Sequence, residues 1–320
     1  MSERIAVIDL GTNTFHLFIV EIEGDALRTL YKEKIAVKIG KGGISKGKIA
    51  ADAWKRAIHT LRIFRTVIDL FEVKVVKGVA TSAIRSAKNG AELISDIKEK
   101  TNIDIQVISG TEEAELIFEG VKAAMDLPDS PQLVMDIGGG SVEFIIGNYD
   151  EIFWRHSFEI GAQRLLDKFH KTDPIPEASV EALYGFATEA LEPLTIAIAR
   201  YKPTGLIGCS GTFDTLKEIY LKREGLAEAS DAKVYELPAV HYEQIHQELM
   251  IKDRQARLKI PGMVTLRVDM IVVASCLIHF VLSHLHTSSI TACAYALKEG
   301  LLYSGFTSSP KAVPSQEASE

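Results

Sequence analysis

The fold is decided by two stretches of the same design, Ile5-Ala6-Val7-Ile8-Asp9-Leu10-Gly11-Thr12-Asn13-Thr14 and Leu133-Val134-Met135-Asp136-Ile137-Gly138-Gly139-Gly140-Ser141. Each begins with an apolar run typical of a buried strand and continues into a lone Asp and a turn of glycine and small polar residues. A second apolar run follows each turn at once, at 15–20 and 142–146, so each turn joins two strands. The repeat predicts two related lobes.

Both turns have the composition of a phosphate-binding site. Glycine at 11 and at 138–140 lets the backbone approach an anion closely, and successive N–H groups can converge on it. Short side-chain donors are added by Thr12, Asn13, Thr14 and Ser141. The carboxylates of Asp9 and Asp136 would repel phosphate unless a cation lies between, and Mg²⁺ is usually held by one or two carboxylates plus phosphate oxygens and water. Two lobes that hold a phosphate chain and Mg²⁺ between them would explain the pattern.

Three familiar kinds of turn fit these stretches less well. An ordinary hairpin explains a single copy about as well, because Asp-x-Gly is common turn chemistry, but it does not explain why both copies pair Asp with polar donors. No Gly-Lys-Ser or Gly-Lys-Thr follows, which argues against a P-loop. A dinucleotide-binding turn would open a helix, whereas Val142, Phe144 and Ile146 continue at strand period.

The residues themselves do not decide the roles of several side chains beside the turns. Ser109-Gly110-Thr111-Glu112 has the spacing of a capping box, so Glu112 is interpreted as structural. Glu113 then falls in the first helical turn. It is interpreted either as a surface residue that compensates the helix dipole or as a base. Arg85 follows a strand and a short turn, as a surface residue or as a bidentate phosphate ligand. Glu143 alternates with its apolar neighbours and either shares the metal with Asp136 or faces solvent.

An ordered set of motifs carries a resemblance to a known family. The set comprises 9–16 and 136–143, with Ala80-Thr81-Ser82-Ala83-Ile84-Arg85, Ile108-Ser109-Gly110-Thr111-Glu112-Glu113-Ala114, Cys209-Ser210-Gly211-Thr212 and Leu297-Lys298-Glu299-Gly300. It resembles the exopolyphosphatase / guanosine pentaphosphate phosphohydrolase family, within the actin, sugar-kinase and acetate-kinase superfamily. The resemblance covers nearly all of the chain up to Tyr303. It implies an α/β fold of two actin-like, ribonuclease-H-like lobes with an active-site cleft between the domains.

The resemblance also implies roles for particular residues. Glu113 matches the family's catalytic Glu, which orients water for attack on the terminal phosphorus, and Arg85 matches a phosphate-binding Arg. The implied metal ligands are Asp9, Asp136 and Glu143. The implied phosphate-binding residues are Gly11, Thr12, Asn13, Thr14, Gly138, Gly139, Gly140, Ser141, Ser210, Gly211 and Thr212. Mg²⁺ is the expected cofactor, and a monovalent cation such as K⁺ is left open as a second ion.

The last motif departs from the family pattern. Cys293 and Tyr295 stand where the family usually has a small Ser and a Gly, and Lys298 replaces an Arg. Any phosphate or nucleotide contact there is left open.

The function predicted from these features is hydrolysis of the terminal phosphate of inorganic polyphosphate with Mg²⁺. Guanosine pentaphosphate 5′-phosphohydrolase is the alternative of the same class. A small-molecule kinase of the superfamily and a non-hydrolysing phosphate or nucleotide sensor are alternatives of other classes. Intact matches at Glu113 and Arg85 favour hydrolysis over both.

Composition excludes several other classes of protein. The 320-residue chain carries a net charge of −7, which argues against a general nucleic-acid binder. The longest apolar stretch, 270–282, is shorter than the roughly 20 residues that span a bilayer, and the N-terminus lacks the pattern of a signal peptide. The 3 cysteines are odd in number and widely spaced, so a reducing cytoplasm is the expected setting. The oligomeric state is left open, a homodimer included.

The predicted organisation follows from strand and helix patterns. An N-terminal lobe is expected over 1–127, a C-terminal lobe over 128–294 after the Pro128-Asp129-Ser130-Pro131 linker, and a final helix over 295–306 that packs back on the first lobe. The tail 307–320, rich in Ser, Pro, Ala and Glu, is predicted to be disordered. Residues 32–48 contain 6 lysines against the single acid Glu33, either as a solvated loop and helix start or as a basic rim that attracts a polyanion.

Overall fold

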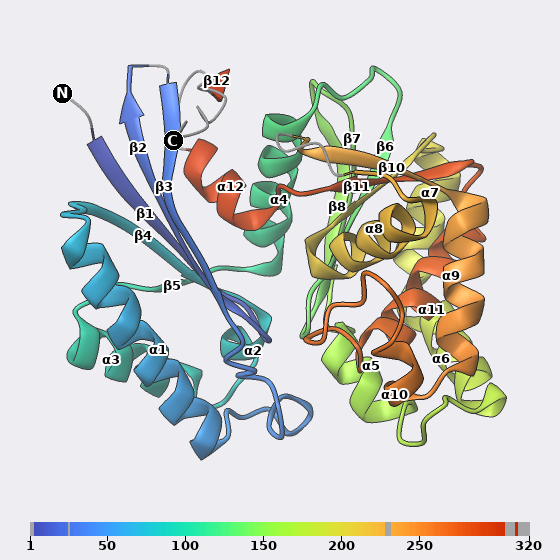
Figure 1. The fold of residues 1–320 in the computed structure, drawn as a ribbon, viewed down its shortest axis with the longest axis horizontal. Coiled ribbons are helices and arrows are strands. Elements are labelled where there is room, and N and C mark those ends of the chain that lie inside the picture. The colour runs from blue at the N-terminus through green and yellow to red at the C-terminus, as the bar shows by residue number, and fades with distance from the viewer. Residues whose placement is uncertain (1–2, 25, 228–231, 305–310, 313–320) are drawn as a thin grey trace. The chain divides into compact units, whose positions relative to one another are not determined.

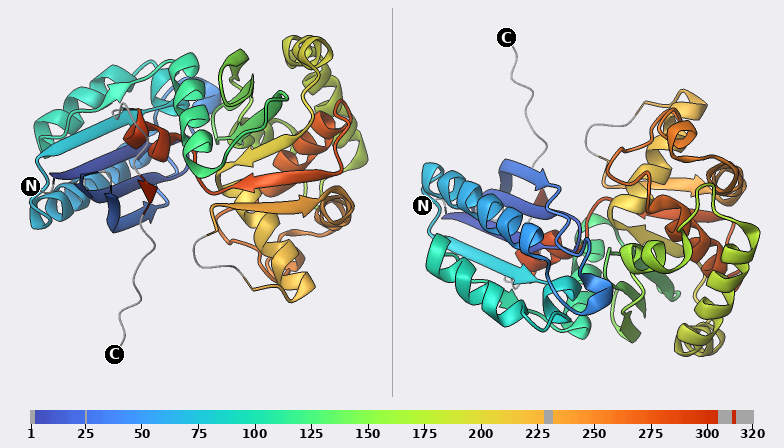
Figure 2. Two further views of the ribbon diagram at one scale, coloured as in Figure 1. Left: turned by 90° about the horizontal axis from the view of Figure 1, so that it is seen from above. Right: turned by 90° about the horizontal axis from the view of Figure 1, so that it is seen from below.

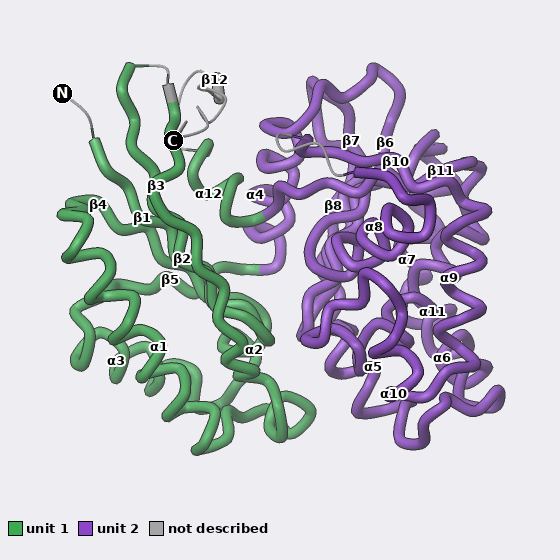
Figure 3. Tube along the Cα trace, in the orientation of Figure 1, with its two compact units in different colours: residues 1–109, 297–320 green, residues 110–296 purple. Residues whose placement is uncertain are grey.

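The chain forms two compact units in the computed structural model, which describes residues 3–24, 26–227, 232–304 and 311–312 (Figure 1). One unit comprises 1–109 with 297–320, and the other comprises 110–296 (Figure 3). Each unit is built on one mixed six-stranded sheet covered by helices. The predicted α/β class with two related lobes is confirmed; the cleft between them stays a prediction.

The first unit has strand order β12-β3-β2-β1-β4-β5. Its strands are β1 (Glu3–Leu10), β2 (Phe15–Glu23), β3 (Ala26–Ile35), β4 (Val75–Ala80), β5 (Gln106–Val107) and β12 (Lys311–Ala312). Its helices are η1 (Ile44–Lys46), α1 (Ala51–Leu70), α2 (Ser82–Arg85), α3 (Gly90–Thr101) and α12 (Leu297–Tyr303). In α1, buried Ala53, Ala57, Leu61, Phe64 and Ile68 recur at helical spacing and form the stripe that packs on the sheet. Figure 2 shows α1 and α3 on one face of this sheet and α12 on the other.

The second unit has strand order β10-β11-β9-β6-β7-β8. Its strands are β6 (Gln132–Ile137), β7 (Val142–Gly147), β8 (Ile152–Phe158), β9 (Leu206–Cys209), β10 (Val234–Pro238) and β11 (Ser289–Cys293). Its helices are α4 (Gly110–Ala124), α5 (Ala162–Phe169), α6 (Glu177–Ala190), α7 (Glu192–Tyr201), α8 (Ser210–Glu224), α9 (Ala239–Ile251), α10 (Arg254–Arg257) and α11 (Ile271–Leu282). Across the described residues, no helix combines the length and apolarity that a membrane crossing requires.

The two sheets repeat one topology. In each, three consecutive strands pair antiparallel, β1-β2-β3 and β6-β7-β8, and a later strand pairs parallel with the first of them, β4 with β1 and β9 with β6. The first strand of each trio is therefore central. Both glycine turns lie at the carboxyl end of such a central strand, where ligands bind in open α/β sheets.

The structure corrects several boundaries. Helix α4 packs on β7 and β8, so the division falls after Ser109 and not at 127, and the Pro128–Pro131 segment lies inside the second unit. Helix α12 belongs to the first unit and contacts β1. Strands β3, β8 and β10 were not predicted; β3 carries Lys32 and Lys34, which are therefore strand residues. The predicted disordered tail, 307–320, lies outside the described residues except for the two that form β12.

Candidate active site

The first turn is closed by its own backbone. Asp9 lies near the end of β1, opposite His16 on β2 and Val79 on β4. The Gly11 N–H donates to the Thr14 carbonyl at 3.1 Å, and a Cβ on Gly11 would lie only 3.0 Å from that oxygen. The Thr14 hydroxyl lies 3.0 Å from His16 Nε2, so His16 contacts a member of the turn. Thr12, Asn13 and Thr14 are all buried.

Segment 37–40 holds the carbonyl groups of this turn. The Lys38 N–H donates to the Asn13 carbonyl at 2.8 Å, and the Gly40 N–H donates to the Thr12 carbonyl at 3.0 Å. Because the C=O and the following N–H of a trans peptide point in opposite directions, the N–H groups of Asn13 and Thr14 point away from this segment. The turn thus presents donors on one side, as anion binding requires.

The second turn has the same geometry, but its carbonyl groups are bound by a different segment, at the start of α5. A Cβ on Gly138 would lie 3.0 Å from the Ser141 carbonyl, which matches the value at Gly11. The N–H groups of Gly161, Ala162 and Gln163 donate to the carbonyls of Gly140, Gly138 and Gly139 at 3.0, 2.9 and 2.9 Å. These three N–H groups belong to the start of α5 and have no partner within the helix. By the same peptide geometry, the N–H groups of Gly139, Gly140 and Ser141 point away from α5.

Two buried carboxylates face each other beside the second turn. Asp136 on β6 and Glu143 on β7 are direct antiparallel partners and are 5% and 1% exposed. Directly opposed residues share one face of the sheet, so two ionised carboxylates there repel each other unless a cation lies nearby. The Ser210 hydroxyl donates to Asp136 Oδ2 at 2.8 Å, and the Ser157 hydroxyl donates to Glu143 Oε1 at 2.7 Å. Glu143 therefore does not face solvent.

This carboxylate pair fits a hard cation. Within the described ranges, no group of three or more His, Cys, Asp or Glu side chains is arranged to hold a metal ion. Mg²⁺ does not need such a group, because it keeps several waters and commonly takes one or two carboxylates with substrate phosphates. Asp136 and Glu143 offer two opposed carboxylates within the second unit, and the expectation that Asp9 joins them as a metal ligand stays a prediction.

A buried arginine, Arg267, lies against the 210–212 segment. Strand β9 ends at Cys209, the parallel partner of Asp136, and α8 begins at Ser210 in a left-handed conformation with φ of 70°. A Cβ on Gly211 would lie 2.2 Å from Arg267 Nη2, so the guanidinium packs on the glycine backbone. Burial lowers the pKa of Arg267, and the negative charges of Asp214 and Asp136 oppose that shift. Arg267 was not among the predicted site residues, because its only signal in the sequence is a charge just before the apolar helix α11.

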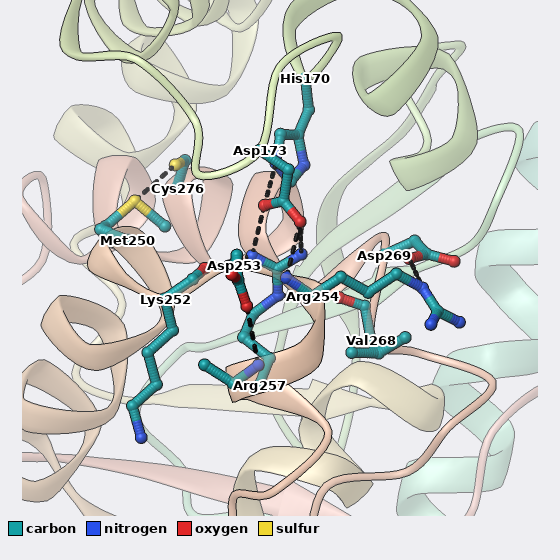
Figure 4. Close-up of polar contacts among 11 residues, drawn as sticks. His170, Asp173, Met250, Lys252, Asp253, Arg254, Arg257, Val268, Asp269 and Cys276 are labelled. Carbon is teal, nitrogen blue, oxygen red and sulfur yellow. Dashed lines mark hydrogen bonds and ion pairs between the residues drawn. The ribbon is translucent and has the colours of Figure 1, made fainter.

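Figure 4 shows the contacts of a second buried arginine, Arg257. Arg257 is 1% exposed and donates to both carboxylate oxygens of Asp173, at 2.7 and 3.1 Å, and to the Val268 carbonyl at 3.1 Å. Asp173 also lies 3.1 Å from His170 Nε2, just after α5. Burial raises the pKa of Asp173, but hydrogen bonds and the charge of Arg257 lower it by more. Through its ion pair with Asp173 and its hydrogen bond to Val268, Arg257 joins the segment after α5 to the residue that follows Arg267.

The predicted catalytic pair lies in two different units. Glu113 stands in the first turn of α4 in the second unit and is 6% exposed, whereas Glu112 is exposed. Glu113 is thus a buried carboxylate at the positive end of a helix, and not a surface residue. Arg85 ends α2 in the first unit, where its Nη1 donates to the Ile108 carbonyl at 3.1 Å.

Apart from Glu113, the predicted site residues of each unit follow neighbouring strands at the carboxyl end of its sheet. In the first, register pairs Leu10 with Ala80, so the turn at 11–14 and the segment that leads to Arg85 leave neighbouring strands. In the second, register pairs Asp136 with Cys209, so the glycine turn and the 210–212 segment leave neighbouring strands. The roles assigned to these residues stay predictions.

Of the departures in the last motif, Cys293 has a structural explanation. Cys293 is the register partner of Cys209 on the neighbouring parallel strand, and its thiol donates to the Tyr295 carbonyl at 3.3 Å. The hydrogen bond with Cys293 and burial raise the pKa of the Cys209 thiol. Cys293 thus does what a Ser hydroxyl could do, as a small buried donor.

These features define a two-unit α/β protein in which each unit carries the same strand–turn–strand arrangement. The chain belongs to the Ppx/GppA phosphatase family, whose model matches residues 18–309. An exopolyphosphatase from Cytophaga hutchinsonii is 49% identical over 95% of this chain and 97% of its own, with a TM-score of 0.92. A Ppx/GppA family member from Aquifex aeolicus is 23% identical over 95% of this chain and 98% of its own, with a TM-score of 0.78, and shares the fold. An exopolyphosphatase-like protein is 25% identical over 94% and 98%, with a TM-score of 0.85.

Proposed function

We propose that this protein is an exopolyphosphatase that hydrolyses the terminal phosphate of inorganic polyphosphate with Mg²⁺. The observation that carries the proposal is the duplicated turn, whose carbonyls are held by protein donors while its N–H groups point the other way. A linear polyanion offers the repeated oxygens that two such turns can bind. Family membership and similarity to an exopolyphosphatase support the same reaction class.

The roles follow from what phosphoryl transfer requires, which is mainly positioning and charge stabilisation. Arg85, oriented by the Ile108 carbonyl, donates to phosphate oxygens. The outward-pointing N–H groups of the turns do the same, namely those of Asn13, Thr14, Gly139, Gly140 and Ser141. Buried Glu113 accepts a hydrogen bond from the attacking water and fixes its direction. Asp136 and Glu143, with Asp9, would hold Mg²⁺, which when bound neutralises charge that develops on the phosphate oxygens.

A cytoplasmic setting is part of the proposal. Cys209, Cys276 and Cys293 are all free and buried, which suits a reducing compartment. A monovalent ion such as K⁺ and a homodimer remain part of the hypothesis to be tested.

Phosphate release from tripolyphosphate, longer polyphosphates, guanosine pentaphosphate and ATP, each with and without Mg²⁺, tests the proposal. We expect Mg²⁺-dependent release of orthophosphate from polyphosphates. Release from guanosine pentaphosphate alone would assign the alternative activity of the family. Phosphate transfer to a small-molecule hydroxyl, or binding of polyphosphate without turnover, would overturn hydrolysis.

The pair Glu113→Gln and Glu112→Gln tests the catalytic role with a matched control, since the two adjacent glutamates differ in burial. Loss of a base that orients water costs roughly 100-fold or more, so Glu113→Gln should lower kcat by that much with little change in substrate Kd. Glu112→Gln should retain nearly full kcat. Equal activity of the two variants would remove Glu113 from the mechanism.

A further inference from the structure

The loop after β3 combines lysines with an apolar anchor. Segment 36–50 contains four lysines and no Asp or Glu. Its isoleucines, Ile39, Ile44 and Ile49, are buried, whereas Lys41, Lys46 and Lys48 are exposed. The loop is closed by its own backbone, with Ile44 N–H donating to Gly40 at 3.0 Å and Lys48 N–H donating to Gly43 at 3.1 Å. The lysines are therefore displayed by a folded loop with a buried anchor.

Two attachments place this loop beside the phosphate-binding groups of its own unit. Near its start, the N–H groups of Lys38 and Gly40 hold the carbonyls of the first turn. Near its end, the Lys88 N–H donates to the Gly47 carbonyl at 2.8 Å, and the Asn89 amide makes hydrogen bonds of 2.8 and 3.0 Å with the N–H and carbonyl of Ile49. Lys88 follows closely on Arg85. Figure 1 accordingly shows the loop beside α2. We call Lys38, Lys41, Lys46, Lys48 and Lys88 the lysine platform.

The platform amines differ from two surface lysines on α3. Lys98 and Lys100 form ion pairs with Asp104 and Asp96 at 2.6 and 2.7 Å. In the part of the chain that the structure describes, no such pair involves a platform lysine. Lys38 also adopts φ of 50°, a left-handed conformation that glycine accepts without strain and lysine does not. The chain thus keeps a cationic side chain where the backbone alone would favour glycine.

We propose that the lysine platform binds the inner phosphates of a long inorganic polyphosphate whose terminal phosphates occupy the first turn. The inference rests on the proposed function and adds a second binding region to it. Nucleic acid fits less well, because 36–50 has no aromatic residue on which a base could stack. Exposed amines act on encounter and affinity and are screened by salt over about 8 Å at physiological ionic strength.

The test compares two triple variants that lower the net charge equally. One is Lys41→Gln, Lys46→Gln, Lys48→Gln; the control is Lys74→Gln, Lys171→Gln, Lys259→Gln, at exposed lysines elsewhere. KM is measured for tripolyphosphate and for long-chain polyphosphate at several salt concentrations. We expect the platform triple to raise the ratio of long-chain to tripolyphosphate KM by about 10-fold and to flatten its salt dependence. The control triple should leave that ratio near the wild-type value.

A single variant separates binding from folding. Lys38→Gly removes the side chain and relieves the left-handed strain, so Tm should hold or rise while long-chain KM rises. Equal ratios for the platform and control triples, or an equal loss on tripolyphosphate and long chains, would overturn the platform. Failure of the wild-type protein to release phosphate from any polyphosphate would overturn the proposed function instead. Tight binding of single-stranded nucleic acid that the platform triple abolishes would show that the surface serves a different polyanion.

Discussion

Gly161→Ala should weaken the hydrogen bonds that hold the second turn against the start of α5. Gly161 has φ of −59° and ψ of 163°, which alanine adopts freely, so the backbone itself does not require glycine. The reason for glycine is space: a Cβ at this position would lie 2.5 Å from the carbonyl carbons of Gly139 and Gly140 and from the Gly140 nitrogen. Ordinary contacts begin near 3.4 Å, and the obstructing atoms are backbone, which cannot rotate aside.

The size of the effect follows from that distance. The turn and the helix must separate by about 1 Å, which strains the three hydrogen bonds from Gly161, Ala162 and Gln163. At about 1 kcal/mol for each bond, we expect unfolding free energy to fall by about 2–3 kcal/mol. A misplacement of about 1 Å in a positioning group costs about 100-fold in rate. Because the turn is proposed to bind phosphate, both kcat and KM should suffer.

The assay pairs urea unfolding with steady-state hydrolysis of tripolyphosphate. Gly185→Ala is the matched control, since Gly185 lies inside α6 and a Cβ there meets nothing within 4 Å. Removal of a helix-interior glycine stabilises by about 0.5–1 kcal/mol, so the control should be slightly more stable and fully active. Gly161→Ala with wild-type stability and kcat would refute the idea that α5 positions the turn.

The second unit supports three more predictions. Asp136→Asn should shift the Mg²⁺ concentration for half-maximal activity upward by roughly 10-fold or more, because one of two opposed carboxylates is lost; an unchanged Mg²⁺ titration would contradict the metal assignment. Arg257→Lys should lower unfolding free energy by about 2–4 kcal/mol, and Asp173→Asn should add little to it if the ion pair acts as a unit, which a double-mutant cycle measures. Burial lowers the pKa of His246 to about 4, so its stabilising contribution is complete above about pH 6.5 and is lost as pH falls toward 4; His246→Gln should remove up to about 3 kcal/mol of acid-dependent destabilisation, measured by urea unfolding at pH 7 and pH 4.5.

Local patterns predicted the two turns and the strands on either side of them. Ile5 to Leu10 and Leu133 to Ile137 are recognisable as strands because both faces of a central strand are buried, which leaves a continuous apolar run. Strands nearer the edge of each sheet, such as β3, have no continuous apolar run. In β3, Lys32 and Lys34 alternate with Glu33, and this mixed charge suggested a loop. Its pairing with β2 overrides that composition.

Local sequence patterns could not predict contacts between residues that are far apart in the chain. Arg267 lies against Gly211, and Arg257 binds Asp173, but nothing in the sequence near either arginine names its partner. The assignment of α4 to the second unit likewise depends on β7 and β8, which follow it in the chain. Periodicity identifies a helix and its apolar face, but it does not identify the surface that covers that face.

The sequence did not predict β3 and β8, the third strand of each trio. For that reason it also did not predict the segments after them, which bind the carbonyl groups of the turns. A turn whose N–H groups converge on an anion is useful only if its carbonyls are turned away, because those oxygens would repel the same anion. Something must bind the carbonyls, and in each unit it is the segment that returns after the third strand, 37–40 after β3 and 161–163 after β8. The functional repeat is therefore longer than the motif: it comprises two strands, a turn, a third strand and a returning segment. The motif is visible in sequence because the proposed chemistry needs Asp and Gly. The segment that binds the carbonyls leaves no sequence signal, because it acts through backbone N–H groups, which almost every residue carries.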